Sequence, residues 1–169
     1  MGSADSSRSI NFALIGHAGD GKTTLADSLL VAAGVINRLG RVDDGTSFMN
    51  WLPEEKHRRA SISTSICPFR WDEAEFTILD APGDANFAGE MRGAIAASDN
   101  AVLVLNAQDG VRVGTERAYH YAREHGLGLA AVANKMDLER ADYEACAKQL
   151  EEAFGVRVVK LHLPIGRGE

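Results

Sequence analysis

The residues best suited to chemistry lie near the start of the chain, at positions 16–24. Their spacing fits the pattern G-x-x-x-x-G-K-S/T, in which glycines turn successive backbone N–H groups inward around an anion. Lys22 is placed to reach the terminal phosphates of a nucleotide, and the hydroxyl of Thr23 to complete a magnesium shell. The sequence therefore predicts a phosphate-binding loop with Gly16, His17, Ala18, Gly19, Asp20, Gly21, Lys22, Thr23 and Thr24 as its binding residues.

The segments on either side of this loop support that prediction. Residues 12–15 are an apolar run typical of a buried strand, and apolar residues recur with helical spacing from Leu25 to Ala33. An inert glycine-rich turn would need neither a strand before it nor a helix after it. The order of strand, loop and helix favours phosphate binding over a structural turn.

Two further polar motifs follow apolar runs predicted to be strands. Asp80 ends one run, and Gly83 offers a backbone N–H that no side chain obstructs. After the other run, a buried carboxylate at Asp137 would match the ring N–H and the exocyclic amine of guanine, a donor pair that adenine lacks. Asn134 is expected to tie this loop to the phosphate loop, with Lys135 lying along the base. Together the motifs predict a GTP-binding domain, with an ATPase or an unrelated kinase as the weaker alternative.

Apolar strands alternate with amphipathic helices along most of the chain. This pattern predicts an α/β fold with a mostly parallel six-stranded sheet, one antiparallel edge strand and helices on both faces. The last strand is expected at 156–163 and the antiparallel hairpin at 65–79. Residues 35–64 lack periodicity, and Asp-Asp-Gly at 43–45 and Trp-Leu-Pro at 51–53 are expected to break any helix or strand there. Because ligands bind at the carboxyl ends of parallel strands, all the polar motifs are expected on one rim.

Composition restricts the class of protein. The chain is 45% apolar and 25% charged, which is typical of a globular domain. A net charge of −6 provides no basic surface for wrapping bare nucleic acid, so no direct DNA binding is expected. No apolar run reaches membrane-spanning length, and two cysteines without metal-ligand spacing favour a cytoplasmic location. Residues 1–9, small and polar, are expected to be a flexible lead-in.

On these motifs the chain resembles the amino-terminal GTP-binding domain of elongation factor G, especially the divergent elongation-factor-G-like translational GTPases. The resemblance rests on Gly-His-x-x-x-Gly-Lys-Thr-Thr at 16–24, Asp-Ala-Pro-Gly at 80–83, Asn-Lys-Met-Asp at 134–137, and matches within 42–51, 106–111 and 161–166. It implies a P-loop NTPase fold, the G domain, over residues 10–169, ending before the inserted subdomain and final guanine-pocket loop of the family. It also implies GTP/GDP and Mg²⁺ as cofactors, GTP hydrolysis, and the ribosome as partner.

The resemblance further implies a first switch at 35–64 and a second at 80–98, ordered by the γ-phosphate and magnesium. Ser61 is the expected counterpart of the magnesium-binding threonine of the family. The implied metal ligands are then Thr23, Ser61 and Asp80. The match around Ser61 is less clean than elsewhere, so a neighbouring serine or threonine is the alternative.

One departure from the family bears on catalysis, for which Lys22, Gly83 and Asp84 are the candidate residues. The family usually has a water-positioning histidine after Pro-Gly, where this chain has Asp84. A carboxylate beside a γ-phosphate adds like-charge repulsion to a reaction whose catalysis is mostly electrostatic. Impaired hydrolysis is expected, and the alternative function is a non-hydrolysing or very slow GTP-sensing switch.

Overall fold

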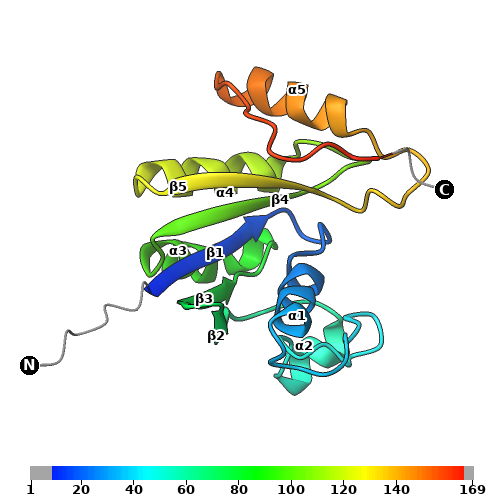
Figure 1. Cartoon of the computed structure of the whole chain (residues 1–169), viewed down its shortest axis with the longest axis vertical. Coiled ribbons are helices and arrows are strands. Elements are labelled where there is room, and N and C mark those ends of the chain that lie inside the picture. The colour runs from blue at the N-terminus through cyan, green and yellow to red at the C-terminus, as the bar shows by residue number, and fades with distance from the viewer. Residues whose placement is uncertain (1–8, 166–169) are drawn as a thin grey trace, which may run out of the picture.

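The computed structural model describes residues 9–165, arranged around a five-stranded sheet of order β2-β3-β1-β4-β5 (Figure 1). β1 pairs in parallel with β3 and β4, β4 pairs in parallel with β5, and β2 runs antiparallel to β3. The α/β class and the antiparallel edge are confirmed. The elements are β1 (Ser9–Gly16), α1 (Lys22–Ala32), α2 (Pro53–Arg58), β2 (Ser65–Trp71), β3 (Ala74–Asp80), the 3-10 turn η1 (Ala85–Phe87), α3 (Ala88–Ala96), β4 (Asn100–Asn106), α4 (Val113–Glu124), β5 (Gly128–Asn134) and α5 (Tyr143–Phe154).

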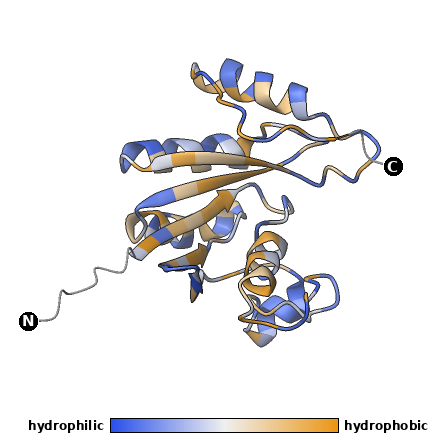
Figure 2. Cartoon of the chain, in the orientation of Figure 1, coloured by the Kyte–Doolittle hydropathy of each residue, from blue (hydrophilic) through white to orange (hydrophobic). Residues whose placement is uncertain are grey.

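Helices cover both faces of this sheet, as predicted. Because side chains alternate along a strand, Ile15 of β1 packs on the face covered by α3 and α4, whereas Leu14 packs on the face covered by α1. α5 joins the first face through Leu150. Figure 2 shows hydrophobic residues along the central strands. Within residues 9–165, no helix has the length and apolar character needed to cross a membrane.

The parallel strands bring the polar motifs to one edge of the sheet. β1 ends at Gly16, β3 at Asp80, β4 at Asn106 and β5 at Asn134. The strand register pairs Leu14 with Asp80 and Asn106 with Asn134, so these ends lie side by side. The predicted rim is therefore present.

The sixth strand expected at 156–163 is absent, and this prediction was wrong. The segment folds back along α5: Glu151 accepts a hydrogen bond from Val158 N at 2.9 Å, and Tyr143 donates one to His162 O at 2.8 Å. Side chains of α5 thus take up backbone groups that a sheet partner would otherwise bond. Leu161 is 79% exposed, so the apolar alternation of the segment buries little surface.

Two local expectations also needed correction. Pro53 does not break a helix but begins the short α2, since a proline at the first helical position loses no intrahelical hydrogen bond. The lead-in expected at 1–9 lies outside the described residues except for Ser9, which begins β1.

Candidate functional site: a phosphate and base rim

The phosphate loop connects β1 to α1, and its backbone takes a shape that requires glycine. Gly21 has φ +90°, a conformation that side chains disfavour, and a side chain there would collide with the Asn134 amide. Lys22 begins α1 and folds back across the loop, donating hydrogen bonds to His17 O at 2.9 Å and to Gly16 O at 3.4 Å. The loop therefore forms a compact cup with one ammonium group inside it.

That ammonium group is strongly affected by its surroundings. Lys22 is only 6% exposed, and burial lowers the pKa of its side chain. The charges of Asp80 and Asp20 oppose this shift and favour the charged form. A buried cation that is only partly compensated is suited to bind a polyanion.

The three residues predicted as metal ligands converge beside Lys22. Thr23 Oγ1 donates a hydrogen bond to Asp80 Oδ2 at 2.7 Å and lies 3.0 Å from Ser61 Oγ. Asp80 is 1% exposed, and its second oxygen, Oδ1, has no hydrogen-bond partner among residues 9–165. Burial raises the pKa of Asp80 to about 6.

These features fit a small divalent cation. Two hydroxyls and a carboxylate are hard oxygen ligands of the kind Mg²⁺ prefers, and Mg²⁺ typically takes only one or two carboxylates alongside substrate phosphates. The orphaned Asp80 Oδ1 is a buried acceptor without a donor, which a cation would satisfy. Among residues 9–165, no group of three or more His, Cys, Asp or Glu side chains is placed to hold a metal ion.

Ser61 is placed by side chains that sequence reasoning missed. Its Oγ donates to Asn50 Oδ1 at 3.0 Å, and Asn50 is buried. Glu55 of α2, also buried, accepts hydrogen bonds from Ile62 N at 2.9 Å and from Ser63 N at 3.2 Å. The hydroxyl that Thr23 contacts is that of Ser61, whereas the hydroxyl of Thr64 donates to Glu90 O. The segment predicted as the first switch is thus held by buried polar groups.

A second buried carboxylate anchors the same segment to α1. Asp27 accepts hydrogen bonds from Phe48 N at 3.0 Å and from Met49 N at 3.1 Å. A signal for it exists in the sequence, because Asp27 falls on the same helical stripe as Thr23 and Leu30. An acidic residue on an otherwise buried stripe indicates a polar partner.

The segment predicted as the second switch follows β3. A side chain on Gly83 would lie 2.6 Å from Ala18 N, so only glycine allows this segment to lie against the phosphate loop. Asp84 is exposed, and its Oδ1 accepts a hydrogen bond from Asn86 N at 2.9 Å as the cap of η1. The side chain that replaces the family histidine is therefore engaged in local capping.

At the base end, Asn134 Nδ2 donates a hydrogen bond to Asp20 O at 2.8 Å, which is the link between the loops that the sequence suggested. Lys135, in the left-handed region at φ 60°, follows it directly. Asp137 was expected to be buried and is exposed. No hydrogen bond or ion pair reaches it from the rest of residues 9–165. An unpaired carboxylate has a much lower free energy in water than inside the fold, which is consistent with its exposure.

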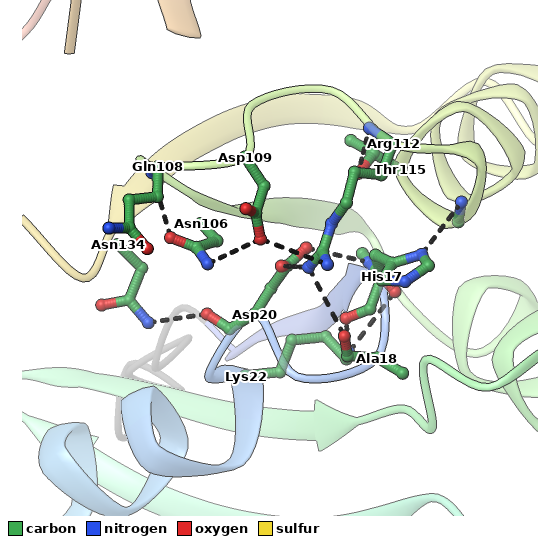
Figure 3. A network of polar contacts seen from close by, with 12 residues as sticks. His17, Ala18, Asp20, Lys22, Asn106, Gln108, Asp109, Arg112, Thr115 and Asn134 are labelled. Atoms are coloured by element: carbon green, nitrogen blue, oxygen red, sulfur yellow. Dashed lines mark hydrogen bonds and ion pairs between the residues drawn. The ribbon is translucent and has the colours of Figure 1, made fainter. Parts of the chain in front are cut away.

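Residues 106–115, from the end of β4 to the first turn of α4, add contacts that the sequence did not reveal (Figure 3). Gly114 N donates a hydrogen bond to His17 Nδ1 at 3.2 Å, and Arg112 forms an ion pair with Asp20. Burial, followed by the charge of Arg112, lowers the pKa of His17, which favours the neutral ring that can accept a hydrogen bond at Nδ1. Nothing in the local sequence signals a pairing across 92 positions.

Comparison with known proteins places this architecture in one family. Residues 7–164 match the model of the elongation factor Tu GTP binding domain. The chain is 34% identical over 158 residues to elongation factor G 2 of Treponema pallidum, covering 94% of this chain and 23% of that protein. It is 35% identical over 158 residues to an elongation factor G-like protein of Mycobacterium tuberculosis, covering 94% and 22%.

Solved structures agree. A crystal structure of a Thermus thermophilus protein superposes with a TM-score of 0.83 at 41% identity, covering 86% of this chain and 22% of that one. A bacterial selenocysteine-specific elongation factor superposes with a TM-score of 0.65 at 28% identity, with the same coverage. The chain thus spans less than a quarter of the length of these relatives. Because the family model matches most of the chain, the chain belongs to the elongation factor Tu GTP binding domain family.

Proposed function

We propose that this chain binds Mg²⁺–GTP and hydrolyses it to GDP, acting in the cytoplasm as part of a protein that works with the ribosome in translocation or a related step. The observation that carries the proposal is the meeting of Thr23, Ser61 and Asp80 beside the buried ammonium of Lys22. A hydroxyl from α1, a hydroxyl from the first switch and the carboxylate at the end of β3 have no structural need to converge. A shared magnesium and phosphate ligand explains their convergence.

In this proposal the chain holds the phosphates from several sides. Backbone N–H groups of the phosphate loop and the start of α1 bind the anion, and Lys22 supplies the balancing charge. Thr23, Ser61 and Asp80 would hold Mg²⁺, which neutralises charge on the phosphate oxygens when bound. Gly83 brings an unobstructed N–H to the terminal phosphate, so the second switch responds to the presence of that group.

The base is selected at the other end of the rim. Asp137 accepts hydrogen bonds from the ring N–H and the exocyclic amine of guanine, while the Lys135 stem covers the base plane. The hydrogen bond from Asn134 to Asp20 O keeps this loop at a fixed distance from the phosphates. Adenine would leave the Asp137 carboxylate without its two donors, which is the physical basis of the preference.

One observation favours a second candidate, a GTP-sensing switch with little or no turnover. Asp84 is a negatively charged residue where the reaction builds negative charge, and its side chain caps η1. Under this candidate the chain binds GTP and orders its switches but hydrolyses the nucleotide very slowly.

Single-turnover hydrolysis of bound GTP, with and without ribosomes, separates the two candidates. Turnover stimulated well above background supports the hydrolase. Retained GTP without stimulation, both for this chain and for the full-length protein, supports the switch. The variant Asp84→His is a matched probe: a large gain in rate would identify Asp84 as the brake, and an unchanged rate would reject that role.

A further inference from the structure

The phosphate loop contains a carboxylate of its own. Asp20 is fully buried, and its Oδ2 accepts a hydrogen bond from His17 N at 3.2 Å (Figure 3). Its negative charge acts to raise the pKa of the Lys22 ammonium, against the effect of burial. A buried negative charge next to a polyphosphate site opposes ligand binding unless a cation offsets it.

Arg112 provides that cation from a different part of the chain. Its Nη2 pairs with Asp20 Oδ1 and donates a longer hydrogen bond to Ala18 O at 3.5 Å. Its Nη1 lies 3.2 Å from Asp109 Oδ2, and Asp109 also accepts a hydrogen bond from Asn106 at 2.8 Å. The guanidinium is therefore fixed between two carboxylates, a geometry that arginine satisfies and lysine does not.

Residues 106–115 contact the phosphate loop at a second point. Gly114 N donates to His17 Nδ1, and a side chain at Gly114 would clash with the His17 ring. Residues 106–115 therefore contact the phosphate loop at three of its residues, while Asn134 holds it from the base side. The shape and the net charge of the loop both depend on this segment.

We propose that Arg112 is a positioning residue for nucleotide binding: it neutralises Asp20 and fixes the phosphate loop, so that residues 106–115 set the affinity for guanine nucleotide. The inference rests on the proposed function of the rim. When Arg112 is pulled away from Asp20, the loop gains an unpaired negative charge and releases nucleotide more readily. An arginine with only a structural role would affect folding but not this charge balance.

A charge-removal test that compares Arg112→Gln with and without a second substitution at Asp20 distinguishes these two roles. Arg112→Gln is expected to weaken Mg–GDP binding roughly ten- to thirtyfold, because it leaves a buried carboxylate unpaired beside the phosphates. Adding Asp20→Asn to Arg112→Gln removes that charge and is expected to recover most of the lost affinity. Arg112→Lys should fall between the parent and Arg112→Gln, because it keeps the charge but not the two-sided geometry. Arg123→Gln, an exposed change on α4, serves as the matched control and should bind like the parent.

Calorimetric GDP titrations and thermal unfolding of the nucleotide-free variants provide the two readouts. Recovery of affinity by the second substitution supports the inference whether or not Arg112→Gln lowers the melting temperature. Equal affinities of the parent and Arg112→Gln, or a double variant as weak as the single one, would overturn it. A parent that binds GDP normally in that case leaves the proposed function intact, whereas a folded parent that binds no guanine nucleotide overturns both.

Discussion

At the phosphate end of the rim, Lys22, Thr23 and Asp80 are each no more than 9% exposed, whereas at the base end Asp137 lies in solvent without a partner in residues 9–165. The phosphate end is assembled by the contacts of the chain itself, from α1, both switches and the 106–115 segment. At the base end, Asn134 links its loop to the phosphate loop through the hydrogen bond to Asp20 O. The phosphate end thus concentrates buried charge, which lowers stability, whereas the base end keeps its specificity group in solvent, where it affects the stability of the fold little.

The largest effect is expected from removing the buried cation. Lys22→Ala should weaken Mg–GDP binding by roughly several hundredfold, because a desolvated charge partner of the phosphates is lost. It should not destabilise the nucleotide-free chain much, since burial already lowers the pKa of Lys22. Calorimetry measures the first effect and chemical unfolding the second. Lys148→Ala, a substitution on the exposed face of α5, is the control. If Lys22→Ala weakens Mg–GDP binding less than tenfold, the buried ammonium is not the main charge partner of the phosphates.

The next effect concerns pH. The pKa of Asp80 is about 6 in the fold and near 3.8 ordinarily, so the folded state binds its proton more tightly than the unfolded state. The resulting stabilisation is complete below the ordinary pKa and is lost as pH rises through 6, a total of about 3 kcal/mol. About half of it falls between pH 7.5 and 5.

Urea unfolding of the metal-free and nucleotide-free chain tests this sign. The parent should gain stability relative to Asp80→Asn as the pH falls from 7.5 to 5, because every other titrating group is common to both proteins. A constant difference in the free energy of unfolding, or a parent that becomes less stable relative to Asp80→Asn as the pH falls, would show that the fold does not raise the pKa of Asp80.

The smallest of these effects belongs to the base end. Asp137→Asn should weaken GDP binding roughly tenfold to a hundredfold and improve binding of xanthosine diphosphate, because an amide donor matches the xanthine carbonyl that replaces the guanine amine. Stability should change by less than about 0.5 kcal/mol, since the side chain is exposed. Unaltered base preference would return the ATPase or kinase alternative to consideration. A large loss of stability would break the contrast between the two ends.

Sequence reasoning anticipated most of the fold because its signals are local. The buried strands, the helix after the phosphate loop and the edge hairpin each follow from apolar periodicity, glycine and proline positions. The prediction of a strand at 156–163 was wrong because apolar alternation alone does not supply a neighbouring strand to pair with. Instead, the side chains of Glu151 and Tyr143 on α5 form hydrogen bonds with the backbone of that segment.

The site was predictable where a motif encodes it and hidden where a distant contact does. Asp80 and Thr23 belong to short motifs, so their roles could be proposed from spacing. Arg112 acts through Asp20, which only folding brings near, and no local pattern marks it. Glu55 bonds to residues at most eight positions away, including Leu52 N at the start of α2, so its acidic place in the first turn of that helix was an available signal. The exposure of Asp137 could not be predicted, because the spacing of motif residues along the sequence does not show which parts of the fold cover a side chain.

The central claim, that this rim binds guanine nucleotides through a charged phosphate cup and a base-selecting carboxylate, is tested most directly by calorimetry on the folded parent chain. Titration with Mg–GDP and Mg–ADP under identical conditions should give a dissociation constant for GDP that is lower by at least about tenfold. Equal dissociation constants for the two nucleotides would contradict the account.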